Sequence, residues 1–293
     1  MHLIKQIAVS VAAFAATTSL VCGDVQQAPE SSTFTQIDVP GAFFTSANAI
    51  NAGGDIVGFY YDDKKPGIHG FLLSNGAFTA IDVPGATSTY AQGINRQGEI
   101  VGLYGDRNFI TRSFLLSNGA FKTIDVPGSD FTEARGINSR GDIVGDYADD
   151  NQISLHGFLR SNRAFTTIDF PGFTGATAAY GINPQGEIVG TYFDASSQIT
   201  HGFLLSNGAF STIDVPGAGF TLPEGIDRHG DIVGAYSDNS SSHGFLLRNG
   251  KFITIDLPGA NFTNANGIDP QGDMIVGTFA DSSGIVHGYL LSK

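Results

Sequence analysis

The chain has little of several residue types on which other proteins depend. Its 293 residues include one cysteine, Cys22, and no tryptophan. A single thiol cannot form an intramolecular disulfide, so the fold must be held together by its own core. Lys and Arg number 15 against 28 Asp and Glu, which gives a formal net charge of −13. Nucleic acids and anionic membranes are bound through a basic surface. We therefore expect neither as a partner.

Long apolar runs are also absent, except at the N-terminus. Residues 1–23 contain Lys5 and then the apolar stretch "IAVSVAAFAATTSLVC". A membrane-spanning helix needs roughly 20 apolar residues, so this stretch is too short to cross a bilayer. It predicts a secretory signal peptide that is cleaved before Asp24. We expect a secreted or extracellular protein without a membrane span. A periplasmic protein and a surface protein lipid-anchored at Cys22 are the alternatives.

What the chain has in abundance is repetition. A phrase around "IDVPG" begins at residues 34, 78, 121, 165, 210 and 252, so its copies are 42 to 45 residues apart. Residues 69–86 and 201–218 differ at only two of eighteen positions. A period of this length is typical of propeller blades or solenoid coils. We expect residues 24–33 to be a short linker and residues 34–293 to be a single domain of six repeats of about 44 residues.

Each repeat contains four short apolar stretches separated by turn residues. One copy reads "YAQGIN", "EIVGLYGD" and "RSFLLSNG", followed by the "IDVPG" phrase. Asn and Gly in "NRQG" and "SNGA" favour tight turns, and Pro ends the last strand. This pattern predicts an all-β, six-bladed β-propeller with four strands per blade. The last repeat is one strand short, so we expect the N-terminal strand to close the last blade. A β-solenoid is the alternative fold.

The repeat unit resembles a known family. Its pattern "GINxxGDIVGxYxD…HGFLLSNG…FTTIDVPG" is similar to that of the HAF-repeat proteins, a bacterial family expected outside the cell. The corresponding phrase here is His-Gly-Phe at 69–71, 156–158, 201–203 and 243–245, with a variant at 287–289 and a departure at 112–114. The resemblance extends over essentially all of residues 34–293. It implies secretion and a repeat fold, and it assigns no catalytic residue.

Residues that recur in every repeat are interpreted as scaffold. Each recurring His opens a third strand, and we expect it to pair with the Asp that ends the preceding strand; these acids are Asp62, Asp149, Asp194, Asp238 and Asp281. The "IDVPG" acids and the turn Asn or Asp residues are oxygen donors of the kind that calcium accepts. No segment has the alternating Asp pattern of a calcium loop. We predict no cofactor, with calcium as the alternative.

Residues that differ between the repeats are interpreted as the site. The positions just before each "GIN" vary from copy to copy, and in a propeller they belong to the strand nearest the axis. Variable residues on a rigid scaffold are where binding usually occurs. The candidate ligand-binding residues are Tyr90, Gln92, Glu133, Arg135, Tyr180, Glu224 and Asn266.

Together these features predict a secreted, non-catalytic, monomeric binding module that recognises an extracellular saccharide or a peptide surface. The sequence has no nucleophile elbow, zinc signature or phosphate loop. A hydrolase or lyase acting on an extracellular polymer is the first alternative, with Glu133, Arg135 and Glu224 as its only candidates for acid–base work. A structural cell-surface repeat protein is the second.

Overall fold

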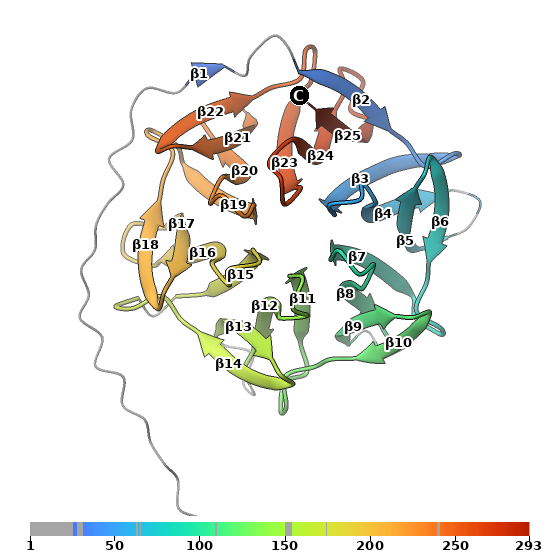
Figure 1. The fold of residues 1–293 in the computed structure, drawn as a ribbon, viewed down its shortest axis with the longest axis horizontal. Coiled ribbons are helices and arrows are strands. Elements are labelled where there is room, and N and C mark those ends of the chain that lie inside the picture. The colour runs from blue at the N-terminus through green and yellow to red at the C-terminus, as the bar shows by residue number, and fades with distance from the viewer. Residues whose placement is uncertain are drawn as a thin grey trace, which may run out of the picture.

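The computed structural model describes residues 26–27, 32–62, 64, 66–108, 110–149, 154–173, 175–238 and 241–292. The predicted signal peptide lies outside these residues. The described chain is all-β, and none of it forms a helix long and apolar enough to cross a membrane. After the two-residue strand β1 (Gln26–Gln27), the strands fall into four layers around a centre (Figure 1).

The innermost layer consists of β3 (Ala42–Ile50), β7 (Ser88–Ile94), β11 (Thr132–Ile137), β15 (Thr177–Ile182), β19 (Phe220–Ile226) and β23 (Phe262–Ile268). The second consists of β4 (Ile56–Asp62), β8 (Ile100–Gly105), β12 (Ile143–Ala148), β16 (Ile188–Asp194), β20 (Ile232–Ser237) and β24 (Met274–Ala280). The third consists of β5 (Ile68–Ser74), β9 (Thr111–Ser117), β13 (Leu155–Ser161), β17 (Ile199–Ser206), β21 (Ser242–Arg248) and β25 (Val286–Ser292). The outermost consists of β6 (Ala77–Ile81), β10 (Ala120–Thr123), β14 (Ala164–Ile168), β18 (Ala209–Ile213), β22 (Lys251–Ile255) and β2 (Thr33–Ile37).

Antiparallel pairing joins one strand of each layer into a four-stranded group, as in β11–β12–β13–β14. The groups stand around the centre as the blades of a β-propeller do (Figure 1). The group of β23, β24 and β25 receives its outer strand from the other end of the chain, because β2 pairs antiparallel with β25. The stretch expected to be a linker contains β1, which pairs in parallel with β22.

The first and last groups are neighbours in space. The Asn266 side-chain amide in β23 donates a hydrogen bond of 3.0 Å to the carbonyl of Ala47 in β3, 219 residues away in the sequence. A solenoid stacks its repeats in a column and keeps its first and last coils apart. The observed contact therefore belongs to a ring, and the solenoid alternative does not describe this structure.

The core lies between neighbouring groups and explains the recurring apolar letters. The Phe of each "HGF" phrase is fully buried, as Phe71, Phe158 and Phe203 show. It meets the Phe of the adjacent outer strand edge to face, with ring centroids 5.5 Å apart for Phe71 and Phe78. One core cluster unites Val57 and Ile81 of one group with Ile94 and Phe114 of the next. Burial of this apolar surface is the main stabilising term that a chain without disulfides has.

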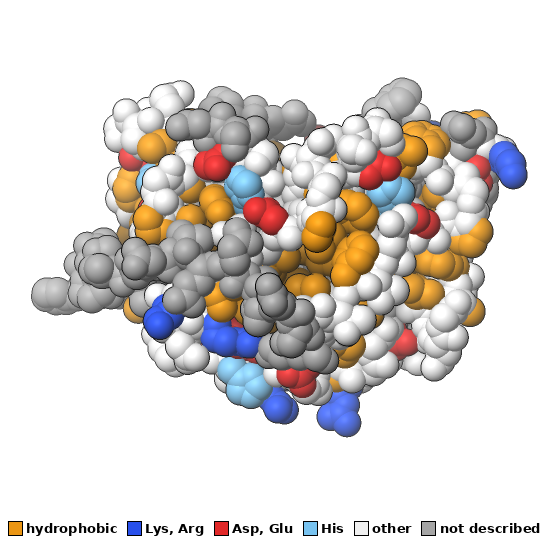
Figure 2. Space-filling view, turned by 90° about the horizontal axis from the view of Figure 1, so that it is seen from above, with side chains coloured by type: hydrophobic (Ala, Val, Ile, Leu, Met, Phe, Trp, Pro, Cys, Tyr) orange, Lys and Arg blue, Asp and Glu red, His pale blue; other side chains and the backbone are white. Residues whose placement is uncertain are grey.

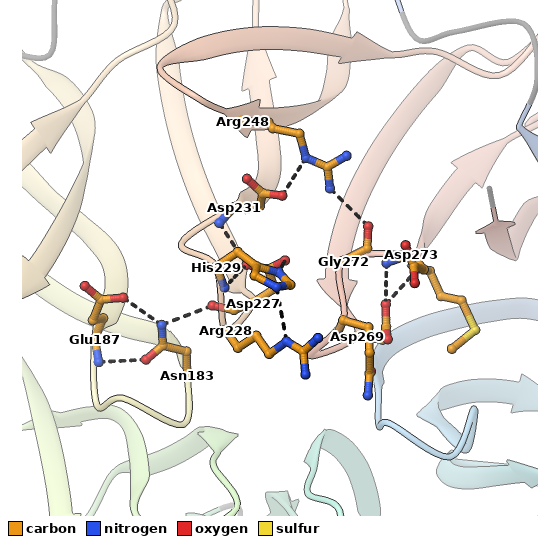
Figure 3. A network of polar contacts seen from close by, with 12 residues as sticks. Asn183, Glu187, Asp227, Arg228, His229, Asp231, Arg248, Asp269, Gly272 and Asp273 are labelled. Atoms are coloured by element: carbon orange, nitrogen blue, oxygen red, sulfur yellow. Dashed lines mark hydrogen bonds and ion pairs between the residues drawn. The ribbon is translucent and has the colours of Figure 1, made fainter.

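The turn between the first and second strands is capped by an Asn in four groups and by Asp227 or Asp269 in the other two. Asn138 accepts hydrogen bonds at Oδ1 from the backbone N–H groups of Arg140 and Asp142, and its Nδ2 donates to the carbonyl of Asn183 in the next group. Asn51, Asn95 and Asn183 make the same contact with the following group. Figure 3 shows the end of this series of contacts at Asp227. Its carboxylate caps its own turn, but it has no side-chain amide that could donate to the next group.

The recurring histidines pair mainly with a different acid from the one expected. His69, His156 and His201 hold the "IDVPG" carboxylates Asp82, Asp169 and Asp214 through Nδ1, at 2.7 to 2.9 Å. The predicted partners are in reach of Nε2 in two groups only, at 3.2 Å for His243 with Asp238 and 3.5 Å for His287 with Asp281. The prediction missed the main partner because "IDVPG" lies on the outer strand, which pairs directly with the strand that the His opens.

One substitution and one pairing between the two ends of the chain show that this pair is a scaffold element. Arg112 stands where the other groups have His, and its Nη1 donates to the corresponding carboxylate of Asp125 at 2.7 Å. His287 holds Asp38, which comes from the N-terminal end of the chain, at 2.8 Å. On the face drawn in Figure 2, His side chains are seen mainly in the upper half and Lys and Arg mainly in the lower half, with one basic side chain at the upper right.

Candidate ligand site in the axial cavity

Each innermost strand carries an irregularity at the same place. The pairing with the second strand shifts register between Ala134 and Gly136 in β11, so Arg135 is an extra residue in the ladder. Register shifts at the corresponding places leave out the equivalent residues of the other strands, which are Asn48, Gln92, Tyr180, Glu224 and Asn266. A β-bulge of this kind re-aims a side chain. The bulge residues are thus among the positions that differ between the repeats.

Recurring glycines make room for this irregular backbone: the glycine of "IVG" occurs in all six repeats and that of "GIN" in five, with Ala49 in the first. A Cβ on Gly145 of β12 would overlap the carbonyl oxygen of Glu133, two residues before the bulge residue of the paired strand. A Cβ on Gly136 would lie 2.6 Å from the carbonyl oxygen of Tyr180 in the next group. The recurring "IVG" and "GIN" glycines thus allow each innermost strand to approach both its partner strand and its neighbour in the ring.

The bulge residues surround a cavity of about 660 Å³ at the centre of the ring. Of the predicted site residues, Gln92, Arg135, Tyr180, Glu224 and Asn266 line this cavity. The other two lie behind its wall. Tyr90 packs against Phe59, a lining residue, with ring centroids 4.9 Å apart, and Glu133 accepts a hydrogen bond from Arg135 Nη2.

Arg135 is the centre of a charged cluster in the wall. Its Nε donates to Asp146 Oδ1 at 2.5 Å, and its Nη2 donates to Glu133. The guanidinium carbon lies 4.7 Å from the centroid of the Tyr180 ring, which is a cation–π geometry. The side chain of Asp146 is 1% exposed, and its Oδ2 is buried without a hydrogen-bond partner among the described residues.

Burial sets the protonation behaviour of this cluster. Desolvation raises the pKa of Asp146 and of Glu133, and the neighbouring Arg135 charge only partly offsets this effect. The pKa of Arg135 is raised by the Asp146, Tyr180 and Glu133 charges despite its burial, so its guanidinium stays protonated. Burial also raises the pKa of the Tyr180 hydroxyl. The cluster is a desolvated ion network with more acids than cations.

Glu224 lies apart from this network. Its carboxylate lines the cavity and takes part in no hydrogen bond or ion pair within the described chain. Burial raises its pKa from 4.5 to about 8, and the Arg135 charge opposes this shift only in part. An acid with this environment holds its proton at neutral pH unless a cation approaches it.

Three amides complete the polar wall. Asn48 donates to the carbonyl of Ala91 and to Gln92 Oε1, both at 3.0 Å, and Asn266 donates to the Ala47 carbonyl and to Thr278. These bonds join neighbouring groups and fix the side chains. The Gln92 amide nitrogen has no partner within the described part of the chain, so it is a donor available to a ligand.

Aromatic rings form the wall at β3 and β4. Phe44 and Phe59 line the cavity with ring centroids 5.5 Å apart and an interplanar angle of 24°. Tyr61 meets Phe44 edge to face at 4.9 Å. Burial and the neighbouring Tyr61 raise the pKa of Tyr90 to about 12, so its hydroxyl remains neutral. This sector offers flat apolar surface, while the bulge residues of the following groups offer polar atoms.

Sequence reasoning missed the variable position of the second strand. Phe59 lines the cavity and Asp146 anchors Arg135, and both occupy the "x" of "IVGxY". The equivalent residues are Leu103, Thr191, Ala235 and Thr278. This position could have been found from the sequence, because it also differs between most repeats. It lies opposite the variable position two residues before each bulge residue, as Glu133 lies opposite Asp146.

The described residues offer no ready cation site. No three His, Cys, Asp or Glu side chains among them are close enough together to hold a metal ion. The "IDVPG" acids bind His or Arg, and the turn acids Asp227 and Asp269 accept backbone N–H groups of their own turns.

No protein-family model and no curated protein matches the chain. Solved structures do, and they are propellers. The β-propeller domain of the Trilobed protease from Pyrococcus furiosus, described as having an open velcro topology, superposes with a TM-score of 0.52 at 10% identity over 87% of this chain and 94% of that one.

Two further likenesses are to a lectin and to TolB. The Aleuria aurantia lectin, seen in complex with Fucα1-6GlcNAc, gives a TM-score of 0.52 at 13% identity over 85% of this chain and 93% of the lectin. TolB from Acinetobacter baumannii gives 0.52 at 15% identity over 84% of this chain and 54% of TolB, so the chain spans about half of that protein. At such low identity these likenesses establish the β-propeller fold alone.

Proposed function

We propose that the protein is a secreted, six-bladed propeller of the HAF-repeat type, closed by β2, that binds a saccharide in its axial cavity. The observation that carries this proposal is the placement of the bulge residues. Most strand positions are the same or similar in every repeat, whereas the bulge residues differ, and these bulge residues line one cavity. Evolution of a binding site on a rigid scaffold produces this distribution.

The chemistry of the wall favours a saccharide over a peptide. Phe44 and Phe59 provide a flat apolar surface on which the C–H face of a sugar ring can lie, and the Gln92 amide and the Glu224 carboxyl are free to meet hydroxyl groups. The cavity volume of about 660 Å³ lies in the range of small-molecule sites and suits a short oligosaccharide. Among the matched structures a lectin supports the class, though not the ligand.

A polymer-cleaving enzyme is the weaker reading of the same residues. Glycoside cleavage generally uses two carboxyl groups that face the scissile bond. Glu133 is bonded to Arg135 behind the wall, which leaves Glu224 as the cavity-lining carboxyl among the three residues nominated from the sequence. Binding without turnover therefore fits the geometry better.

The test is a melting-temperature and calorimetric screen of the purified protein against neutral oligosaccharides. Two site variants, Phe59→Leu and Gln92→Ala, are compared with Thr79→Ala, an exposed position on the outer strand β6. Leu is the natural residue at the equivalent position 103, so the first variant should fold.

We expect a sugar that stabilises the wild type and Thr79→Ala to bind both site variants at least about tenfold more weakly, as loss of one stacking contact or one hydrogen bond in a desolvated site implies. Equal binding by all four proteins would place the sugar outside the axis and overturn the proposal. Release of shorter sugars during the experiment would establish the enzyme alternative, and binding of peptides alone would establish the other ligand class.

A further inference from the structure

Glu224 is half-buried, and its carboxyl group is open to the cavity rather than sealed in the core. A carboxylate in such a place is stabilised most by a cation or by hydrogen-bond donors. Glu224 lies on the bulge of β19 and lines the cavity, yet within the described chain its carboxyl group has no such partner. Scaffold cannot account for it, because the other repeats place amides, Arg and Tyr there.

The nearby cation cannot serve as the missing partner. Arg135 is held by Glu133 and Asp146 and covered by the Tyr180 ring. Asp146 Oδ2 is itself buried and unpartnered. At the level of the bulges this one guanidinium thus already serves two other carboxyl groups, and it is not bonded to Glu224. Arg96 and Arg228 line the cavity beside the turns rather than at the level of the bulges.

The aromatic sector is placed to hold the rest of such a ligand. β19 and β7 face one another across the centre of the ring, and Tyr90 of β7 packs on Phe59 (Figure 1). Gln92, also on β7, lines the same cavity, and its amide nitrogen has no partner within the described part of the chain. A ligand that lies against Phe59 therefore has Glu224 on the far side of the same cavity.

We propose that Glu224 binds a cationic nitrogen, and hence that the ligand of the axial cavity is an amino sugar with a free, protonated amine. This inference rests on the proposed saccharide-binding function and adds the chemical class of the sugar. The ammonium group supplies the partner that Glu224 lacks within the described chain, and the ring of the same sugar uses the aromatic surface of Phe44 and Phe59. An N-acetylated sugar has no charge to offer and lacks this interaction.

The protonation of Glu224 gives the inference a second signature. Its pKa of about 8 keeps the empty carboxyl neutral at pH 7. An ammonium bound beside it favours the carboxylate, so binding releases a proton. The other ionisable groups in electrostatic contact with Glu224 are Arg135, Tyr180 and Tyr289. Arg135 stays charged and both tyrosines stay neutral near pH 7, so the released proton comes from Glu224.

The experiment compares a glucosamine oligomer with its N-acetylated counterpart of equal length by isothermal titration calorimetry. Wild type, Glu224→Gln and Asp130→Asn are measured at pH 7 in two buffers that differ in ionisation enthalpy. Asp130 is an exposed acid outside the cavity, so its variant controls for the general attraction of a cation to an acidic protein.

For wild type and Asp130→Asn we expect the amine form to bind about tenfold more tightly than the acetylated form, with up to one proton released. Glu224→Gln should bind both forms within about threefold of each other and release none. A preference for the amine that persists in Glu224→Gln overturns the inference. So does a wild type that binds neutral sugars through Phe59 and Gln92 but shows no preference for the amine, and in that case the proposed function still stands. Absence of any saccharide binding overturns both.

Discussion

Tyr289 is the residue whose energetic effect is easiest to isolate. It occupies the place that Phe has in the other groups, is 0% exposed, and has a buried hydroxyl without a hydrogen-bond partner in the described structure. A buried, unpaired hydroxyl costs about 1–3 kcal/mol. We predict that Tyr289→Phe raises the free energy of unfolding by at least about 1 kcal/mol and the melting temperature by roughly 2–4 °C per kcal/mol. Denaturant unfolding and calorimetry measure both.

The reciprocal change is the control for Tyr289. Phe245 is the equivalent residue of the preceding group and is also 0% exposed. Phe245→Tyr places a hydroxyl in the same environment and should lower the melting temperature. If both substitutions lowered it, shape rather than the hydroxyl would be decisive at this position.

Glu224 should impose a pH dependence on stability. Its pKa rises from 4.5 to about 8 on folding, so between these values the folded state keeps a proton that the unfolded state has lost. Stability therefore falls as pH rises through this window, by at most about 1.4 kcal/mol per pH unit from this group. We predict that Glu224→Gln is more stable than wild type at pH 8 and that the difference vanishes near pH 4. Melting curves from pH 4 to 8 test this, with Asp130→Asn as the control.

Within each innermost strand, the backbone and the side chain of the bulge residue have different roles. The backbone of Arg135 belongs to the frame, because its carbonyl oxygen lies where a Cβ on Gly93 of the preceding group would come within 2.7 Å. Its side chain faces the cavity. The glycines around the bulges allow the close backbone packing of the frame, and the bulge side chains lie outside that packing, toward the cavity.

A strand-scale prediction follows for Gly145. An added methyl group there would overlap the Glu133 carbonyl and press on the Phe158 ring. We predict that Gly145→Ala destabilises the protein by more than about 3 kcal/mol, in the range of severe core overpacking. In the control, Gly219→Ala, the nearest atom is the Ser237 hydroxyl at 3.3 Å, which can rotate away. Equal losses in the two variants would show that the close backbone approach is not the cause.

The sequence predicted the all-β architecture, and five of the residues it singled out line the cavity, for a physical reason. Turn residues and alternating apolar residues are local signals, and their recurrence in six repeats distinguishes them from chance. Cross-strand geometry is not local. The pairing of His69 with Asp82 depends on which strand lies beside which, and so does the position of Asp146 opposite Glu133. The β-bulges also could not be predicted from the sequence, because a bulge is recognised only from the pairing of one strand with its neighbour.

At the scale of the molecule, the ring depends on a junction between the two ends of the chain. Phe34 of β2 contacts Phe279 edge to face at 5.7 Å, and Asp38 holds His287 at 2.8 Å. We predict that removal of residues 1–37 lowers the melting temperature by more than about 10 °C, because the third strand of that group loses its outer partner and exposes an edge.

A shorter truncation separates this junction from the preceding segment. Removal of residues 1–31 deletes β1 but keeps all of β2. This variant should melt within a few degrees of the full chain in a calorimetric scan. A large loss there would assign the stabilisation to the pairing of β1 with β22 instead.

The division of labour at the bulges also has a consequence for how such a protein changes over time. Copying a repeat copies its frame, glycines included, while the bulge side chain can differ between copies. Six copies place up to six different side chains around one cavity, and bonded neighbours such as Asn48 and Gln92 have to change together. An experimenter could likewise vary these six positions together and select variants that bind new ligands on the same scaffold.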